Sequence, residues 1–327
     1  MQPFTYARAA TLDQAFHLAQ APGAMLMAGG TTMVDLMRGD LAAPSAIVDI
    51  GHLHELEAFD TSGPVLRFGA LARMADVATD AALLRDYPAL AESLQLAASP
   101  QIRNAATVGG NLLQRTRCVY FRDGVSACNK RLPGSGCTAL DGVTREMALF
   151  GTSERCIATY PGDWGYALAA FDTSIEVRSA SGGRTIPFAE LHVAYGDDPT
   201  RETTLRPGEV ITAILVQATP TGRRSTYVKV RDRQSYAYAV VSAAVALEMD
   251  GDTVRHARVS LGGVATKPWR SQAAEAALAG VVLTETVALA AGHAAFVGAM
   301  PRGQNAFKIE LGARAVARAA LVASKRA

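Results

Sequence analysis

Four cysteines are the residues of this chain best suited to chemistry. Cys118, Cys128, Cys137 and Cys156 fall within 39 consecutive residues, and the sequence has no other cysteine. Four thiolates are the full ligand set of a [4Fe–4S] cluster. The pattern therefore points to a metal or redox centre in the middle of the chain.

Three other interpretations of these cysteines are open. Structural zinc sites usually have closely spaced C-x₂₋₄-C pairs, whereas the intervening residues here number 9, 8 and 18. Two disulfides would suit a secreted chain, but the N-terminal sequence MQPFTYARAATLDQAF lacks the charged and apolar regions of a secretory signal. Four unrelated free thiols are the last alternative, and the spacing alone does not decide.

The segment around the cysteines is basic and rich in turn-forming residues. Its cations are Arg115, Arg117, Arg122, Lys130, Arg131, Arg145 and Arg155. Positive charges near a four-thiolate cluster would offset its negative charge and raise its potential, although a solvated basic loop is a simpler explanation. Glycines and Pro133 predict a loop, and a bound cluster would order such a loop.

Two other segments contain paired glycines of the kind that admit a diphosphate. Glycine lets backbone N–H groups approach a phosphate, and consecutive N–H groups form a concave anion site. The first segment consists of Met25, Leu26, Met27, Ala28, Gly29, Gly30, Thr31, Thr32 and Met33. The second offers Thr107, Gly109, Gly110 and Asn111. Neither fits the GxGxxG fingerprint, which argues against a Rossmann site, and a Gly-Gly pair by itself is more often a plain turn.

Composition excludes several classes of protein. The hydrophobic fraction of 49% and the charged fraction of 19% are typical of a soluble globular chain. A net charge of +2 gives no electrostatic reason for nucleic-acid binding. The longest apolar run, near residues 237–247, is too short to span a membrane. Because no signal is visible, the cytoplasm is the default compartment.

Periodicity predicts the elements that must hold these segments. Thr11 and Gln14 form a capping-box pattern at the start of a helix. The first half should contain strands at 25–28, 46–50 and 65–70, a helix ending near Arg38, and helices interrupted at Pro88. The second half should begin with a helix at 166–171 and a hairpin that pairs 174–177 with 184–186 across Gly182-Gly183. Two strands at 239–249 and 254–261, joined by an Asp-Gly turn, should follow. The chain should end with helices at 271–279, 284–296 and 305–324.

Taken together and in order, five motifs resemble the FAD-binding subunit of the molybdenum hydroxylase family, which includes xanthine dehydrogenase, carbon monoxide dehydrogenase and bacterial aldehyde oxidoreductases. The motifs are AGGT at 28–31, IRNxATxGGN at 102–111, PxD at 161–163 with ALAAFD at 167–172, YxK at 227–229 with AVVS at 239–242, and LGGVAxxPxR at 261–270. The resemblance covers nearly the whole chain.

One departure from the family pattern is informative. Roughly fifty residues separate Asn111 from Pro161, where many relatives have only a few, and all four cysteines lie in this insertion. The arrangement resembles the branch represented by periplasmic aldehyde oxidoreductase, whose flavin subunit carries FAD and an additional [4Fe–4S] cluster. The resemblance therefore implies that Cys118, Cys128, Cys137 and Cys156 ligate such a cluster.

The resemblance also implies an α+β fold and a set of cofactor contacts. Residues 1–220 would form a two-subdomain FAD-binding domain of the vanillyl-alcohol-oxidase type, with the cluster-binding insertion at about 112–160. Residues 224–327 would form an α+β domain of the CO dehydrogenase flavoprotein type. The first glycine motif would wrap the FAD diphosphate, with Met25 and Leu26 in the pocket wall. Contacts to the cofactor are implied for Thr107 and Asp163, and positions near the flavin for Ile211 and Lys229.

The implied function is electron transfer within a molybdenum-dependent aldehyde oxidoreductase or hydroxylase. This subunit would hold no catalytic residue for the substrate. Its partners would be a [2Fe–2S] small subunit and a molybdopterin large subunit, and its acceptor oxygen, a quinone or a carrier protein instead of NAD⁺. Two alternatives are a subunit like that of 4-hydroxybenzoyl-CoA reductase, with inward electron flow, and a non-catalytic assembly scaffold. Co-export with a signal-bearing partner would place the complex in the periplasm.

Overall fold

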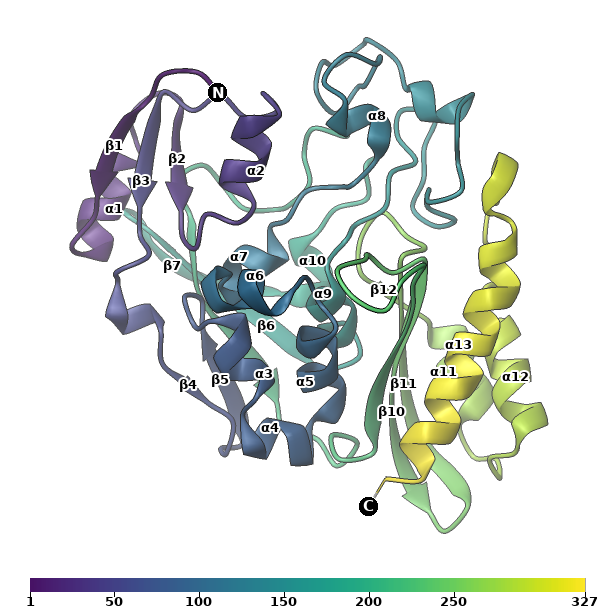
Figure 1. Cartoon of the computed structure of the whole chain (residues 1–327). Coiled ribbons are helices and arrows are strands. Elements are labelled where there is room, and N and C mark those ends of the chain that lie inside the picture. The colour runs from purple at the N-terminus through teal and green to yellow at the C-terminus, as the bar shows by residue number, and fades with distance from the viewer. Residues whose placement is uncertain (327) are drawn as a thin grey trace.

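The first unit of the chain is a small parallel sheet. The computed structural model describes residues 1–326 and opens with strands β1 (Thr5–Arg8), β2 (Ala24–Met27) and β3 (Ala46–Asp49), in the order β1-β3-β2 (Figure 1). Helices α1 (Leu12–Leu18) and α2 (Met33–Arg38) connect these strands. The sequence predicted every element here except β1, which is largely exposed and lacks an apolar pattern. Thr11 caps α1 as predicted, because its hydroxyl accepts from the Gln14 N–H.

A five-stranded sheet forms the centre of the molecule. Its strands are β4 (Phe59–Asp60), β5 (Val65–Gly69), β6 (Thr173–Ser179), β7 (Gly182–Pro187) and β8 (Val210–Gln217), in the order β4-β5-β8-β6-β7. The predicted hairpin of β6 and β7 is confirmed, with Ile175 opposite Ile186. Its turn lies at 180–181, however, because Gly182 and Gly183 already belong to β7.

Short helices cover this central sheet. They are α3 (Met74–Ala78), α4 (Ala81–Asp86), α5 (Pro88–Gln95), α6 (Pro100–Ala105), α7 (Val108–Leu112), α9 (Asp163–Leu168) and α10 (Phe188–Leu191). Trp164 of α9 is fully buried, and its ring meets Phe68 edge-on at 5.5 Å between centroids. The sequence predicted α9 at 166–171. The observed helix starts and ends three residues earlier, since Ala170 and Phe171 form a tight turn with i→i−3 hydrogen bonds into β6.

The cysteine-containing insertion is mostly loop, as predicted, with a short α-helix, α8 (Val119–Arg122), at the top of Figure 1 and a single 3₁₀ turn, η2 (Thr138–Leu140). It has an apolar cluster of its own, which includes Phe121, Met147, Ile157 and Tyr195 as well as three of the cysteines. Cys128 and Cys137 face each other across an isolated antiparallel bridge. Packing and hydrogen bonds therefore order this segment, which sequence composition presented only as a turn-rich loop.

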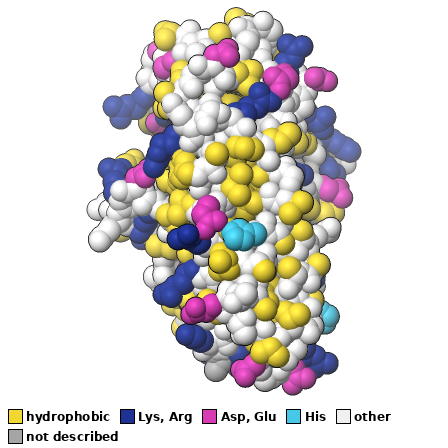
Figure 2. All heavy atoms as spheres, turned by 90° about the vertical axis from the view of Figure 1, so that its right-hand side faces the viewer, with side chains coloured by type: hydrophobic (Ala, Val, Ile, Leu, Met, Phe, Trp, Pro, Cys, Tyr) yellow, Lys and Arg dark blue, Asp and Glu magenta, His cyan; other side chains and the backbone are white. Residues whose placement is uncertain are grey.

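The C-terminal unit is an antiparallel sheet covered on one face by helices (Figure 1). Its strands are β9 (Ser225–Val230), β10 (Val241–Asp250), β11 (Thr253–Gly262) and β12 (Trp269–Arg270), and its helices are α11 (Gln272–Leu278), α12 (Glu285–Ala294) and α13 (Phe307–Ser324). The predicted hairpin at Asp250 is confirmed, with Gly251 at φ +57°. Figure 2 shows the outer, helical side, where hydrophobic side chains lie among charged ones. Among residues 1–326, no helix combines the length and the apolar character needed to cross a membrane.

Candidate functional site

The first glycine motif follows β2 as a tight loop and lines a cavity of about 270 Å³, here called the glycine-loop cavity. Gly30 has φ +71°, a left-handed conformation that favours glycine. The predicted residues that line this cavity are Met25, Leu26, Met27, Ala28, Gly29, Gly30, Thr31, Thr32, Met33, Thr107, Gly109, Gly110 and Ile211. The fold thus brings together segments that lie up to 186 positions apart, from Met25 to Ile211.

The backbone of this loop leaves several donors free. Within residues 1–326, the N–H groups of Gly29, Gly30, Thr31 and Thr32 donate to no protein acceptor. The loop carbonyl of Gly30 instead accepts from Val34 N–H at the start of α2. Consecutive free N–H groups around a left-handed glycine form an anion-binding concavity. This loop has the donors that a diphosphate requires.

The second glycine motif contributes in a different way from the one we expected. The N–H groups of residues 108–111 all donate within the protein, to Ala72 O, Ala70 O, Thr107 Oγ1 and Thr107 O. They are therefore not available to a phosphate. Gly109 instead permits close packing, because a Cβ there would lie 2.8 Å from the Cβ of Ala70. The motif brings the polar side chains of Thr107 and Asn111 to the cavities.

The two glycine motifs are also in direct contact. A Cβ on Gly29 would lie 1.8 Å from the carbonyl oxygen of Ala105, at the end of α6. No side chain fits in that space, so glycine at this position lets the loop after β2 rest on the second motif. The contact fixes the first sheet against the central unit at the wall of the cavity.

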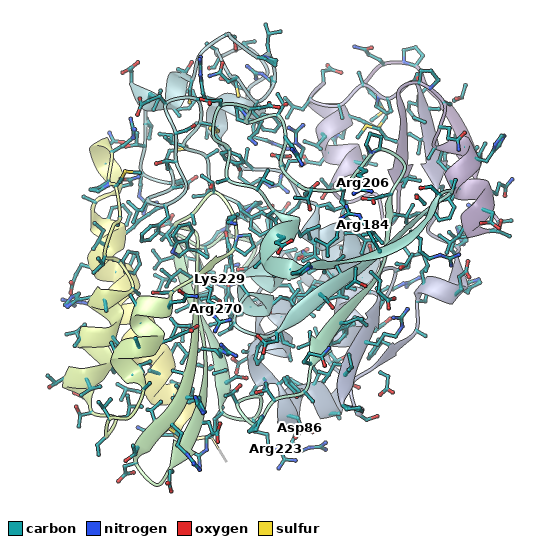
Figure 3. All side chains as sticks on the ribbon, turned by 180° about the vertical axis from the view of Figure 1, so that it is seen from behind. Asp86, Arg184, Arg206, Arg223, Lys229 and Arg270 are labelled. Carbon is teal, nitrogen blue, oxygen red and sulfur yellow. The ribbon has the colours of Figure 1, made fainter. Side chains whose placement is uncertain are left out.

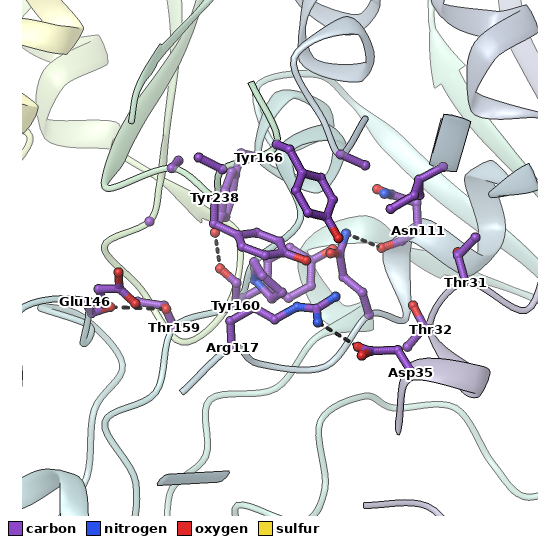
Figure 4. Close-up of a pocket in the computed structure, with 18 of the residues that line it drawn as sticks. Thr31, Thr32, Asp35, Asn111, Arg117, Glu146, Thr159, Tyr160, Tyr166 and Tyr238 are labelled. Atoms are coloured by element: carbon purple, nitrogen blue, oxygen red, sulfur yellow. Dashed lines mark hydrogen bonds and ion pairs between the residues drawn. The ribbon is translucent and has the colours of Figure 1, made fainter. Parts of the chain in front are cut away.

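A larger cavity of about 570 Å³ adjoins the first, and Figure 4 shows its wall. We call it the tyrosine cavity, because its lining includes Tyr160, Tyr166, Tyr236 and Tyr238. The two cavities share the lining residues Thr31, Thr32 and Gly110, so they adjoin at the glycine loop. Asn111 also lines the tyrosine cavity, and its buried Oδ1 has no hydrogen-bond partner among residues 1–326. An aromatic cavity with an unused acceptor suits a flat heterocycle that donates hydrogen bonds.

Asp163 and Lys229 form a buried ion pair. Lys229 Nζ lies 2.9 Å from Asp163 Oδ2, and the two side chains are 1% and 4% exposed. Tyr227 donates to the same carboxylate at 2.6 Å. Burial raises the pKa of Asp163, although Lys229 and Tyr227 oppose that shift. Lys229 lies in the middle of the molecule (Figure 3), and neither member of the pair lines the two cavities. Their contact with a cofactor stays a prediction.

All four cysteines line one small cavity of about 10 Å³, here called the thiol cavity. Cys118, Cys128 and Cys156 are buried, and Cys137 is half-buried. Burial raises the pKa of Cys118 to about 11 and that of Cys156 to about 12, and it raises the pKa of Cys137 as well. Within residues 1–326, no three His, Cys, Asp or Glu side chains converge as they would on a single ion.

Several groups around the thiol cavity favour the thiolate form. Hydrogen bonds from backbone N–H groups oppose this rise in pKa. The donors are Tyr120 and Phe121 to Cys118, Ala139, Leu140 and Ile157 to Cys137, and Ala158 to Cys156. The ammonium group of Lys130 acts on Cys156 in the same direction. Its side chain is fully buried, donates to Pro199 O and Glu202, and lies 3.7 Å from the ring centroid of Tyr195. A fixed positive charge therefore stands beside the thiols.

Most of the other predicted cations are held in ion pairs. Arg117 and Arg122 both bind Asp35, Arg115 binds Glu202, Arg131 binds Asp123, and Arg145 binds Asp232. Burial by itself would raise the pKa of Asp35, but hydrogen bonds from Arg122 and Arg117 outweigh it and lower that pKa. The segment is thus a network of paired charges instead of a freely solvated basic loop.

Lys308 was not among the predicted site residues, and its side chain is buried, with 1% exposed. Its ammonium group donates to the carbonyl oxygens of Met147 and Gly263, both of which line the tyrosine cavity. Burial lowers the pKa of Lys308 to about 7. A lone lysine within the predicted helix at 305–324 is usually exposed, so no pattern marked it. Lys308 ties α13 to the end of the insertion.

We expect Lys308 to make stability depend on pH between 7 and 9. In this window the unfolded lysine, with an ordinary pKa of 10.5, binds a proton that the folded lysine has largely lost. Stability therefore rises with pH, by at most about 1.4 kcal/mol per unit. Lys308→Met should remove this slope, whereas Lys325→Met, at an exposed site, should keep it. Denaturant unfolding of the holoprotein at pH 7, 8 and 9 measures the effect, and equal slopes in both variants would refute it.

The chain matches two known domain families over most of its length. A family model described as the FAD binding domain in molybdopterin dehydrogenase matches residues 2–217, and the CO dehydrogenase flavoprotein C-terminal domain matches residues 226–323. The chain is 44% identical over 321 residues to the aldehyde oxidoreductase FAD-binding subunit PaoB of Escherichia coli K12, with 97% of each chain covered. It is 25% identical over 301 residues to the carbon monoxide dehydrogenase medium chain of Hydrogenophaga pseudoflava, with 90% of this chain and 88% of the relative covered.

Solved structures share the whole fold. Quinoline 2-oxidoreductase from Pseudomonas putida 86 aligns with a TM-score of 0.77 at 23% identity, over 99% of this chain and 98% of that chain. Carbon monoxide dehydrogenase from Hydrogenophaga pseudoflava aligns with a TM-score of 0.74 at 24% identity, over 100% and 99%. The expected α+β fold is confirmed. The chain therefore belongs to the FAD-binding medium subunits of the molybdenum hydroxylase family and is a subunit of an oxidoreductase of the aldehyde oxidoreductase type.

Proposed function

We propose that each chain binds one FAD without a covalent link, across the two adjoining cavities. The observation that carries the proposal is the set of four unengaged N–H groups at Gly29–Thr32, on which the diphosphate would rest. The tyrosine cavity would take the ring system, with Asn111 Oδ1 as an acceptor. When bound, FAD supplies a centre that accepts and returns electrons. The protein's work is to hold and tune it.

We further propose that Cys118, Cys128, Cys137 and Cys156 bind a [4Fe–4S] cluster. Their shared cavity, the surrounding N–H groups and the buried Lys130 support this assignment. Such a cluster spreads its thiolates over four irons, so they need not converge on one point. The free space is small, so the four side chains would turn outward around a cluster. Cys118 lines both the thiol cavity and the tyrosine cavity, which would put the two cofactors side by side.

The role we propose is to pass electrons from substrate oxidation in partner subunits to an external acceptor. The partners would be a [2Fe–2S] small subunit and a molybdopterin large subunit, since relatives bear the names medium chain and FAD-binding subunit. The acceptor would be oxygen, a quinone or a carrier protein. We place the boundary between the two domains at residues 220–224. We propose that the complex assembles in the cytoplasm and is exported only together with a signal-bearing partner.

Gly30→Val tests the flavin site. The new side chain strains the left-handed loop and displaces the N–H groups from the diphosphate. Losing two charge-assisted hydrogen bonds, each about 1.5–3 kcal/mol, should weaken FAD binding about a hundredfold or more. Gly280→Val is a matched control, because Gly280 has φ +76° and no atom within 4 Å of its Cβ position. Flavin content per chain is the measurement, and a normal content in Gly30→Val would remove this loop from the site.

A further inference from the structure

We propose that Arg117 is the positive charge that faces the flavin ring and favours its reduced form. This inference rests on the proposed FAD site. Arg117 stands in the insertion, directly before Cys118, and its side chain lines the tyrosine cavity (Figure 4). Its Nη1 donates to Asp35 Oδ2 at 2.8 Å. Its Nε is buried and has no partner within residues 1–326. A guanidinium has five N–H donors, and the one on Nε is left without a protein partner.

The ion-paired side chains around Arg117 carry a net positive charge. Asp35 accepts from both Arg117 and Arg122, at 2.8 and 2.6 Å, so this triad carries one net positive charge. The pair of Lys229 and Asp163 is neutral as a whole and lies outside the cavity lining. The triad, and not Lys229, therefore provides the excess positive charge at the cavity wall.

The other charged groups of the tyrosine cavity are Glu146, Asp232 and Arg233, which are exposed to solvent. Asp232 is paired with Arg145 at 2.8 Å. Water screens charges in such positions strongly. Arg117 is more enclosed, with a side chain 28% exposed, and its effect on a bound ring is accordingly larger.

The orientation of Arg117 is fixed from two sides. Asp35 on α2 holds the guanidinium from the first unit, and the ring of Tyr238, in the loop before β10, lies 4.8 Å from it. Both contacts hold the guanidinium at the wall of the cavity that Arg117 lines. A charge held in this way needs no rearrangement when negative charge develops beside it.

The chemistry requires only the electrons that the proposed function supplies. A flavin ring that takes up two electrons from the partner iron–sulfur carriers and one proton from solvent gains one negative charge. A fixed positive charge stabilises this form more than the neutral oxidised ring. Arg117 therefore raises the potential at which the bound cofactor accepts electrons and holds the reduced form more tightly.

Arg117→Met in the purified FAD-bearing protein tests the inference. The variant should still fold, because Asp35 keeps its bond to Arg122. We expect its preference for reduced over oxidised FAD to fall about tenfold, which lowers the two-electron potential by about 30 mV. Arg117→Lys should keep most of the preference. Arg233→Met removes an equal charge at the exposed part of the same cavity and should shift the potential much less.

Redox titration of the bound flavin is the first measurement. The second measurement is the equilibrium binding of oxidised FAD, and of chemically reduced FAD without oxygen, to the apoprotein. The ratio of the two dissociation constants gives the preference for reduced FAD, even if Arg117→Met binds both forms weakly. Equal weakening of both forms, or a potential equal to that of the wild type, overturns the inference and leaves the FAD site standing. A wild-type protein that binds no FAD would instead overturn the proposed function.

Discussion

Lys229→Met should lower the free energy of unfolding by about 3–5 kcal/mol, the usual cost of leaving a buried charge without its partner. Lys229 Nζ donates to Asp163 at 2.9 Å and to Leu96 O at the same distance. The pair thereby joins β9 to α9 and to the end of α5, where the C-terminal unit meets the central unit. Removing the lysine raises the pKa of Asp163 further, since burial then acts with less opposition. Denaturant unfolding at neutral pH measures the loss.

Two further variants separate this explanation from general damage. Asp163→Asn combined with Lys229→Met removes both charges and should recover most of the stability. Arg67→Met breaks the exposed ion pair between Arg67 and Glu176, in which the two side chains are 48% and 35% exposed. This variant should lower the free energy of unfolding by less than about 1 kcal/mol. If Lys229→Met lowered the free energy of unfolding no more than Arg67→Met does, the buried pair would not stabilise the contact between the C-terminal and central units.

Cys128→Ser should abolish iron binding, from about four irons and four sulfides per chain to almost none, because the cluster needs four thiolates. FAD should stay bound, since Cys128 lines neither the glycine-loop cavity nor the tyrosine cavity. Iron, sulfide and flavin analysis of protein prepared without oxygen gives the result. Ser135→Ala is the matched control, because Ser135 Oγ accepts from the Cys128 N–H in the same turn and the variant keeps every thiol. Zinc in place of iron in the wild type, or unchanged iron in Cys128→Ser, would contradict the cluster assignment.

Local patterns in the sequence were enough to predict several elements. The cap at Thr11, the hairpin turn at Gly251 and the glycine loop all depend on neighbouring residues, and each appears where the pattern indicated. Strand β8 was missed, although it is the central strand of the main sheet. Its partners come from distant segments, since Val65 lies opposite Gln217. A continuous apolar run does not reveal such partners.

In the candidate site, too, local features could be predicted from the sequence and long-range contacts could not. The residues of the glycine loop were predicted as a set, because they are contiguous. The free N–H groups of that loop and the engaged ones of the second motif were not predictable, because hydrogen bonding depends on which segments meet. Lys229 stood out within its motif, but its partner Asp163 lies 66 positions away, and their mutual neutralisation is visible only in the fold. Arg117 was only one cation among seven until Asp35 and the cavity gave it a place.

The place of β8 in the central sheet bears on how the protein is made. Both β5 and β6 pair with β8, so the sheet cannot close until residue 217 has left the ribosome. The last of the four cysteines emerges about 60 residues earlier, an interval of seconds at roughly 5–20 residues per second. The four thiols are therefore synthesised before the central sheet is complete, and also before Tyr195, which packs in their own apolar cluster. During biosynthesis, oxidation of these side chains would compete with assembly of the proposed cluster.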